Sequence, residues 1–269
     1  MSQPKRVIGD AALILVVAGI AAMALFPHWL TSYDPLALNL TDAFDAPGRA
    51  HLLGADESGR DVWARIVYGA RDSLTIGVAA TAVGMIPAII LGTISALSPR
   101  VVDAAIVRLL EALYAVPLLL LALLVITIAG VGKGPAILAV GLSVAPGYAR
   151  IVRSQVMSLR RSEMIDAAVV DGLPRWRIVT RHLLPNALRP LLALVTLGVG
   201  QAVIWASALS FLGLGTPPPA PEWGAMLAAG RIYISTAWWL TVFPGLAVVV
   251  TAMVATLVGR RLSGEVHAL

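Results

Sequence analysis

Long apolar stretches separated by short polar segments make up most of this chain. A helix that crosses a lipid bilayer needs about 20 consecutive, mostly apolar residues. Six stretches reach or approach that length, the fourth being the shortest, with Pro146 near its end. The pattern predicts an all-α polytopic membrane protein with six transmembrane helices. The predicted spans cover residues 7–26, 74–97, 112–131, 135–149, 190–214 and 236–258.

The composition supports a membrane protein. Of the 269 residues, 58% are hydrophobic and 13% are charged, and the mean hydropathy is +0.85. Soluble domains carry about 25% charged residues. A single soluble core could not bury this much apolar surface, which excludes a cytosolic enzyme and a disordered tail. The chain has no cysteine, so disulfides, thiolate metal sites and cysteine nucleophiles are excluded as well.

Lysine and arginine are distributed unevenly between the predicted loops. With Lys5 and Arg6 in the cytoplasm and six alternating spans, 14 of the 20 basic residues fall inside and 6 outside. Because cytoplasmic loops carry an excess of basic residues, we expect both termini in the cytoplasm. The first stretch also has features of a cleavable secretory signal, but its removal would leave five spans and reverse this distribution. An uncleaved anchor is therefore predicted. The net charge of +5 is explained by the basic residues of the cytoplasmic loops, so binding of nucleic acid is not expected.

Two predicted outer segments contain candidate docking residues for an external partner. Residues 27–72 include Asp56, Arg60 and Asp61, and the loop after the fifth predicted span includes Glu222 and Trp223. A solvated connector is the alternative for residues 27–72, and both interpretations stay open. The carboxylates near His51, which are Asp56, Glu57 and Asp61, are not at a recognisable metal-ligand spacing, so helix capping and arginine pairing are their expected roles.

Beyond Asp10, near the start of the first, the predicted spans contain no Asp, Glu, Lys, Arg or His, and Lys133 lies in the turn between the third and fourth. Proton- or ion-coupled carriers generally need ionisable groups inside the bilayer, so a driving force from elsewhere is expected. The sequence Gly132-Lys133-Gly134 lacks the spacing and the Ser or Thr of a phosphate-binding loop, so no ATP hydrolysis by this chain is expected. No catalytic pair appears either. The few polar residues of the spans include Thr81, Gln201, Ser207 and Ser210.

The largest predicted cytoplasmic loop, residues 150–189, contains a short helical hairpin. Ser162 is placed to cap a helix over residues 162–172, and Glu163 suits the positive end of its dipole. Small and apolar residues follow at helical spacing, and Gly172 is expected to end the helix in a left-handed conformation. A second helix is predicted over residues 175–184, ending at Pro185. Such a hairpin packs beneath the spans, binds another protein, or rests on anionic lipid. The small residues favour contact with a protein backbone.

This hairpin resembles the coupling signature of ABC importer permeases. Asp166-Ala167-Ala168, then Gly172, then Leu184-Pro185 follow its spacing. Asp166 stands where the signature has Glu, and His182 where it has Ile. Other segments are similar to the peptide/nickel branch of the family, over about residues 1–260. They include residues 51–56, 59–61, 209–215 and 221–226.

The resemblance implies a type I ABC importer permease fold and a place in the bacterial inner membrane. Residues 1–72 would form an anchor helix and an external loop, and residues 73–260 the permease domain, with a coupling helix at about residues 162–173. The chain itself would bind no cofactor, and ATP and Mg would be held by one or two partner ATPase subunits. A second, non-identical permease subunit, an extracytoplasmic binding protein and membrane lipid would be the other partners. The implied coupling residues are Glu163, Asp166, Ala167, Ala168, Gly172, Leu184 and Pro185.

The transported solute is not determined by these motifs. Peptides are favoured, and nickel or a metal chelate is the alternative within the same machinery. A non-transporting membrane scaffold or a passive channel is the alternative class, because spans without charges fit these as well. Copurification with a nucleotide-binding subunit distinguishes the importer from both.

Overall fold

The molecule is a bundle of helices. The structure is a computed structural model that describes the backbone of residues 3–266 and the side chains of residues 10–263. Within that part, one isolated bridge between Ala55 and Asp61 is the only β-pairing, so the all-α prediction is confirmed. The helices are α1 (Gln3–Leu25), α2 (Val62–Leu97), α3 (Arg100–Ala115), α4 (Leu118–Ala129), α5 (Lys133–Arg160), α6 (Glu163–Val170), α7 (Arg175–Arg177), α8 (Leu184–Leu188), α9 (Leu191–Phe211), α10 (Trp223–Gly230) and α11 (Trp239–Val266), with a π-helical turn at Ile178–Leu183 and 3-10 turns at Pro27–Trp29, Leu40–Asp42 and Arg231–Tyr233.

Four of the described helices are long and apolar enough to cross a membrane: α2, α5, α9 and residues Trp239–Ser263 of α11. The bent pair α3–α4 raises the number to five if it is counted as one span. The apolar part of α1 with described side chains, Asp10–Leu25, is shorter than these helices. The predicted total of six spans is therefore not confirmed.

The third predicted span, residues 112–131, is not a continuous helix. α3 ends at Ala115, α4 begins at Leu118, and the two helices are bent by 92° at this break. Pro117 explains the break, because its ring disfavours helical backbone at the preceding residue, and Val116 is extended with φ −76° and ψ 126°. At 12 residues, α4 is roughly 18 Å long, well short of the roughly 30 Å hydrocarbon core.

Helices α2 and α5 extend beyond the spans predicted for them. The α2 helix begins at Val62, where the Asp61 carboxylate accepts a hydrogen bond from the Ala64 N–H at 2.7 Å and caps the helix. Residues 62–72, expected to be part of an external connector, are thus helical, and the division between residues 72 and 73 falls inside α2. The α5 helix continues through Pro146 to Arg160, so the predicted loop of residues 150–189 starts as a helix.

Glycines allow the main helices to pack closely. A Cβ atom on Gly84 of α2 would lie 2.7 Å from the carbonyl oxygen of Gly141 in α5. A Cβ atom on Gly141 would lie 2.7 Å from the carbonyl oxygen of Ala80. Helices α9 and α11 approach in the same way, because a Cβ atom on Gly200 would lie 2.9 Å from the Cβ of Ala255. Such backbone contact is typical of helices that pack inside a membrane.

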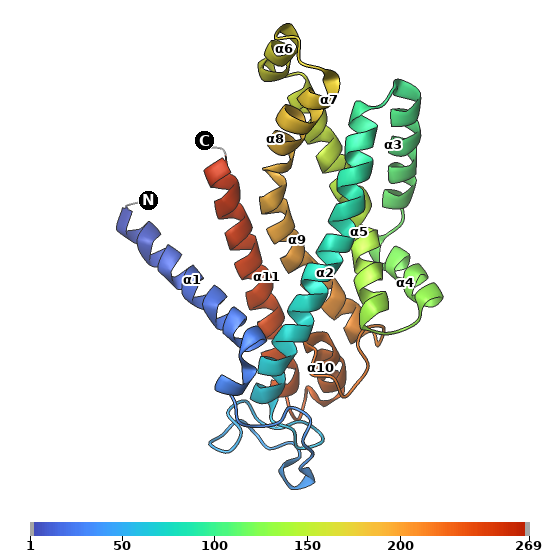
Figure 1. The fold of residues 1–269 in the computed structure, drawn as a ribbon. Helices are drawn as coiled ribbons and strands as arrows, with labels where there is room; N and C mark the ends of the chain where they lie inside the picture. The colour runs from blue at the N-terminus through green and yellow to red at the C-terminus, as the bar shows by residue number, and fades with distance from the viewer. Residues whose placement is uncertain (1–2, 267–269) are drawn as a thin grey trace.

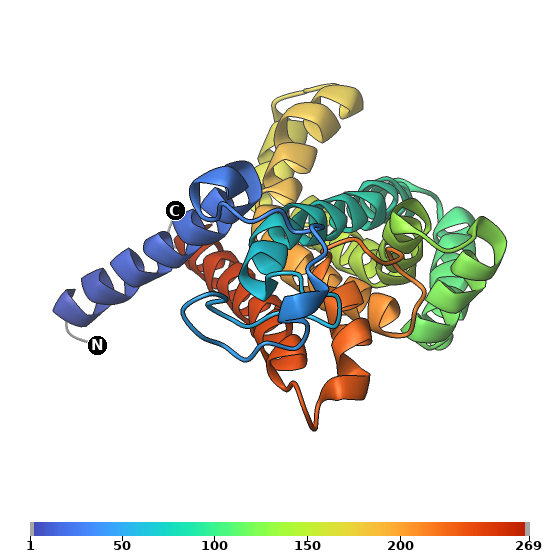
Figure 2. The same ribbon diagram turned by 90° about the horizontal axis from the view of Figure 1, so that it is seen from below.

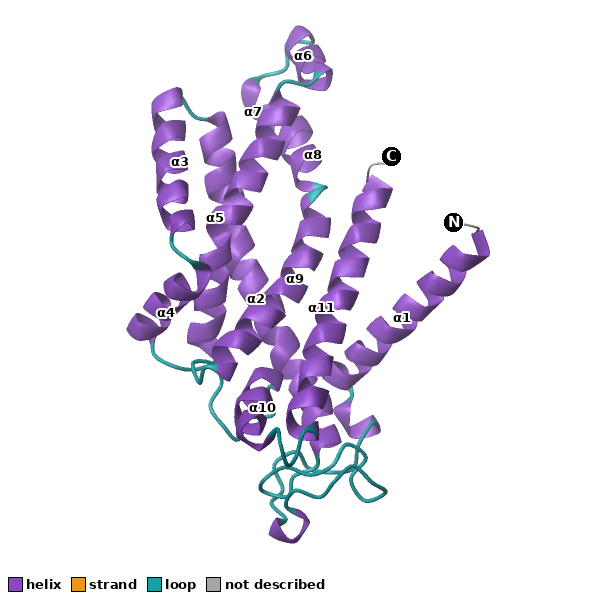
Figure 3. Cartoon of the chain, turned by 180° about the vertical axis from the view of Figure 1, so that it is seen from behind, coloured by secondary structure: helices purple, strands orange, loops and turns teal. Residues whose placement is uncertain are grey.

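The two ends of the bundle differ in structure. Helix α6 projects at one end, and the loops of residues 26–61 lie beside α10 at the other (Figures 1 and 3). Figure 2 looks onto the loop end, where the loops cross over α2 and α11. The beginning of α1 and the end of α11 point toward the α6 end (Figure 1), and Arg261 of α11 forms an ion pair with Asp10 of α1.

Candidate functional site

The projecting segment, residues 161–188, is a helical hairpin whose first helix, α6, has well-defined ends. Ser162 precedes α6 in an extended conformation, with φ −86° and ψ 150°. At the other end Gly172 has φ +70°, its N–H donates to the Val169 carbonyl at 3.0 Å, and the Leu173 N–H donates to the Ala168 carbonyl at 3.2 Å. These two hydrogen bonds form a Schellman motif, which requires the left-handed backbone that glycine adopts easily. The predicted left-handed stop at Gly172 is confirmed.

Two details of the hairpin correct the sequence analysis. The Ser162 hydroxyl donates to the Leu159 carbonyl at 2.7 Å and does not cap α6. Pro185 does not end the second helix, which runs from α7 through the π-helical turn into α8 and stops at Leu188. A π turn is wider than an α turn. It relieves the contact that the Pro185 ring would otherwise make with the carbonyl of Arg181, four residues earlier.

The inner face of α6 is packed against the second helix of the hairpin, at the π-helical turn Ile178–Leu183. Ile165 is 7% exposed and Ala168 5% exposed, and both belong to an apolar cluster that we call the hairpin seat. Burial of these two side chains, three residues apart on one face, explains how an 8-residue helix holds a fixed position. The seat includes residues of α2, α5, α6, the second helix of the hairpin and the start of α9. Its buried members are Ala96, Val152, Val156, Ile165, Ala168, Ile178, Leu183, Ala187 and Leu191.

The outer face of α6 is exposed and partly apolar. Of the predicted coupling residues, Glu163, Asp166, Ala167 and Gly172 lie on this accessible surface, and Val170 beside them is 86% exposed. A Cβ atom on Gly172 would meet nothing within 4 Å, so the space next to it is open. Ala168 is different, because it faces the seat. In the second helix of the hairpin, Leu184 is half-buried and Pro185 is exposed.

An ion pair that the sequence did not indicate lies beneath the seat. The Arg153 guanidinium of α5 donates to both carboxylate oxygens of Asp103 in α3, at 2.8 and 2.6 Å. The Ser95 hydroxyl of α2 donates to the same carboxylate at 2.5 Å. The network ties three helices together. Asp103 and Arg153 are 50 residues apart, and no local motif marks them as partners.

At the loop end, Asp56 and Arg60 are structural. The Asp56 carboxylate accepts hydrogen bonds from the backbone N–H groups of Ser58, at 2.8 Å, and Arg60, at 2.9 Å. It also lies 3.6 Å from the guanidinium groups of both Arg60 and Arg65. Asp56 is only 5% exposed. The expected arginine pairing is confirmed.

Asp61 holds the same loops to α2. Besides capping α2, its carboxylate lies 2.9 Å from Nδ1 of His51, whose Nε2 lies 3.2 Å from Asp42. Burial lowers the pKa of His51, but the hydrogen bonds and charges of Asp61 and Asp42 outweigh it, so the pKa is raised overall. A protonated His51 therefore strengthens the packing of these loops.

Glu222 and Trp223 are also structural, and each is 1% exposed. The Glu222 carboxylate caps α10 by accepting hydrogen bonds from the N–H groups of Gly224 and Ala225 at 2.8 and 2.9 Å. Burial raises the pKa of Glu222, and the hydrogen bonds oppose that rise. The Trp223 indole donates to the Ile66 carbonyl at 3.0 Å. The side chains of Asp56, Asp61, Glu222 and Trp223 are buried and make structural contacts, and their role in docking an external partner stays a prediction.

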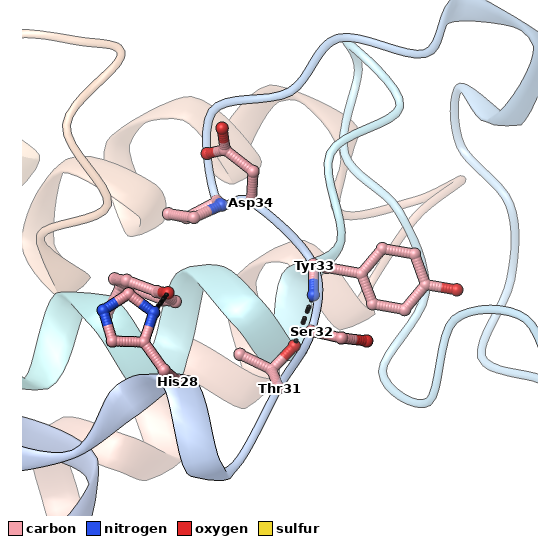
Figure 4. Close-up of a pocket in the computed structure, with 7 residues that line it drawn as sticks. His28, Thr31, Ser32, Tyr33 and Asp34 are labelled. Atoms are coloured by element: carbon pink, nitrogen blue, oxygen red, sulfur yellow. Dashed lines mark hydrogen bonds between the residues drawn. The ribbon is translucent and has the colours of Figure 1, made fainter.

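The accessible surface at this end includes an open pocket of about 500 Å³ (Figure 4). Residues 31–35 line it together with His28 and Tyr68. The Tyr68 hydroxyl lies 2.7 Å from Nδ1 of His28, and the Tyr33 N–H donates to the Thr31 hydroxyl at 3.2 Å. Over the described residues, no group of three or more His, Asp or Glu side chains is arranged to hold a metal ion.

Comparison with known proteins places these features in a family. The model of the family described as "binding-protein-dependent transport system inner membrane component" matches residues 88–266. A putative peptide transport system permease protein of Brucella suis biovar 1 is 40% identical over 247 residues, which cover 92% of this chain and 83% of the relative. The di/tripeptide transport system permease protein of Pseudomonas aeruginosa is 37% identical over 262 residues, covering 95% and 85%. The dipeptide transport system permease protein of Escherichia coli K12 is 37% identical over 262 residues, covering 95% and 87%.

Solved structures share the fold. A chain of the MetNI methionine ABC transporter, in an inward-facing conformation, superposes with a TM-score of 0.62 at 18% identity, covering 75% of this chain and 96% of that one. A chain of an amino acid ABC transporter crystallised with histidines superposes with a TM-score of 0.58 at 15% identity, covering 76% and 94%. The expected ABC permease fold is thus confirmed.

Proposed function

The chain belongs to the family of binding-protein-dependent transport system inner membrane components, and from this membership we propose that it is a permease subunit of an ATP-driven peptide importer. It is a multi-pass membrane protein, and its relatives are permeases named for peptide transport. In the proposal, the chain forms half of a translocation path in the bacterial inner membrane. A second, non-identical permease forms the other half, an extracytoplasmic binding protein delivers the peptide, and one or two ATPase subunits hold ATP and Mg.

The observation that carries the coupling proposal is the contrast between the two faces of α6. Ile165 and Ala168 hold one face against the second helix of the hairpin, which in turn contacts α5, while Asp166, Ala167 and Val170 are left exposed on the other face. A short helix with a fixed seat and an exposed face of small residues transmits force as a rigid body when a partner binds it. We assign the exposed face, with Glu163 and Gly172, to the ATPase contact.

The proposed orientation places the α6 end in the cytoplasm and the loop end outside. The uneven distribution of basic residues among the loops supports this orientation. The beginning of α1 and the end of α11, which are expected in the cytoplasm, point toward the α6 end (Figure 1). Residues 1–72 then supply the anchor helix and most of the outer loops, and residues 73–260 the permease domain. Membrane lipid surrounds the spans, and nucleic acid is not among the proposed partners.

A matched pair of variants at Gly172 tests this function. Asn and Asp have nearly the same shape and both tolerate a left-handed backbone, so Gly172→Asn controls for the added side chain. Gly172→Asp adds a charge where the ATPase would approach closely, and an unpaired charge buried in an interface costs several kcal/mol. We expect the Asp variant to insert normally yet to copurify with at least tenfold less ATPase than the Asn variant.

The measurement uses the complete transporter, expressed with the second permease and the ATPases encoded beside it. Copurification from mild detergent reports assembly, and ATP-driven uptake of a labelled dipeptide into proteoliposomes with the binding protein reports transport. Normal uptake by the Asp variant would refute the assignment of Gly172. A wild-type chain that never copurifies with an ATPase would refute the importer and favour a scaffold or a channel. A parallel assay with labelled nickel separates the two cargo classes.

A further inference from the structure

A second cavity, of about 610 Å³, opens between α3, α4, α5 and α9. The break between α3 and α4 forms one wall, from Leu113 to Leu118, and a stretch of α5 from Ser143 to Ile151 forms another. Gln201 and Trp205 of α9 complete the lining. Helices α3, α4 and α5 lie on one side of the bundle (Figure 3), and α9 contacts α5. Its volume lies within the range of about 300–1,000 Å³ that is typical of small-molecule sites.

One lining residue is charged, and it has no carboxylate partner in the described chain. Arg150 of α5 is exposed, and its guanidinium carbon lies 4.4 Å from the centre of the Tyr114 ring of α3. Arg153, one turn further along α5, is by contrast fully engaged with Asp103. Stacking on an aromatic ring orients a guanidinium without neutralising it. Arg150 is thus a preoriented cation facing an open cavity.

A second polar group of the cavity is also unoccupied. Gln201 lies at the middle of α9, and its exposed side chain makes no hydrogen bond within the described residues. The other polar residues noted in the spans are placed differently, because Thr81, Ser207 and Ser210 are all buried. Polar groups inside a membrane are costly, and those that face a cavity mark solute paths.

We propose that this cavity is a transit site for the transported peptide, in which Arg150 binds the C-terminal carboxylate and Gln201 hydrogen-bonds the peptide backbone. The inference rests on the proposed importer function and names the path residues and the chemical group that they recognise. A guanidinium pairs with a carboxylate through two parallel hydrogen bonds, and a side-chain amide both donates and accepts, as a peptide group does. The same cation repels a bare divalent metal, so peptides or anionic chelates fit the cavity and free nickel does not.

Direct binding to the assembled transporter tests the site. The permease–ATPase complex is placed in nanodiscs without the binding protein and titrated with alanyl-phenylalanine and with its C-terminal amide. We expect the wild type to bind the free acid about 10- to 100-fold more tightly than the amide, as a charge-assisted pair provides. Arg150→Gln should reduce that ratio to within about twofold, and Gln201→Leu should weaken both probes while keeping the ratio. Arg108→Gln, which alters an exposed arginine of α3 outside the cavity lining, should match the wild type.

The outcomes separate the alternatives. Equal binding of acid and amide by the wild type, absence of binding, or a preserved ratio in Arg150→Gln would overturn the proposal. The titrations are repeated in phosphatidylcholine nanodiscs with and without phosphatidylglycerol, and a ratio that depends on the anionic lipid would assign Arg150 to a headgroup and overturn it too. ATPase retention and ATP hydrolysis are measured on the same samples. If ATPase retention and ATP hydrolysis are intact but the cavity does not bind the peptide as expected, the proposed importer function stands and the transit site is refuted. If no ATPase is retained, both proposals are refuted.

Discussion

Truncation of Ile165 should loosen the hairpin without altering the surface that is proposed to contact the ATPase. Ile165 is 7% exposed and packs in the seat, so Ile165→Ala removes buried carbon atoms and leaves a cavity. Such a change costs about 2–5 kcal/mol in a protein core. The hairpin lies at the end of the bundle and can relax more easily, so we expect about 2–3 kcal/mol. The loss applies to local opening of the hairpin, because the main helix contacts are elsewhere.

Hydrogen exchange of the backbone amides in residues 163–173 measures that opening. A loss of about 2–3 kcal/mol speeds exchange by about 25- to 150-fold when exchange follows the opening equilibrium. Val170→Ala is the matched control, because Val170 is 86% exposed and outside the seat. It should leave exchange unchanged and weaken ATPase binding. Ile165→Ala should instead retain ATPase binding and uncouple ATP hydrolysis from peptide uptake.

The reasoning is refuted if Ile165→Ala exchanges at the wild-type rate, because the seat would then contribute nothing to the position of α6. It is equally refuted if Val170→Ala speeds exchange, because the outer face would then be part of the packing.

Two further predictions concern the rest of the molecule. The pKa of His51 is raised, so protonation of His51 stabilises the outer loops fully below about pH 6.5, and this stabilisation is lost as the pH rises through the folded-state pKa. Limited proteolysis of these loops should therefore accelerate with rising pH in the wild type. An equal acceleration in His51→Gln would contradict this origin. Gly141→Ala should lower the thermal midpoint, because the added Cβ would lie 2.7 Å from the Ala80 carbonyl oxygen and such overpacking costs about 1–3 kcal/mol. Gly134→Ala, in the same helix with open space around it, should slightly raise the midpoint, and a similar drop in both variants would rule out the packing explanation.

The hairpin could be predicted from the sequence because its rules are local. The left-handed stop at Gly172 depends on one residue without a Cβ, and the buried positions Ile165 and Ala168 follow from helical spacing. The sequence also contained the signal for the break at Val116-Pro117, because a proline disfavours helical backbone at the residue before it. The long apolar stretch around it was interpreted as one span because hydropathy records composition and ignores the backbone.

The roles of charged residues could not be predicted in the same way. Asp56 and Glu222 were expected at a docking surface, because carboxylates are rarely buried unless they are paired. Their partners, the guanidinium of Arg65 and the N–H groups at the start of α10, become neighbours only in the folded chain. Pairing of Asp103 with Arg153 depends likewise on the packing of α3 against α5. One sequence without aligned homologues contains no signal for such contacts.

Helix α5 connects the two proposed sites. Its residues Val152 and Val156 belong to the hairpin seat, and Arg150 on the same helix faces the cavity. Val156 lies six positions after Arg150, which is about 9 Å along a helix. The ion pair between Arg153 and Asp103 lies between them and fixes α3, the helix that carries Tyr114. A movement of α6 that displaces the seat must therefore move α5 as a unit, or else break this ion pair. If the ion pair breaks, α3 and α5 separate and the distance between the Arg150 guanidinium and the Tyr114 ring changes. Closure of the ATPases would then alter the affinity of the cavity for a carboxylate without any direct contact between the two sites.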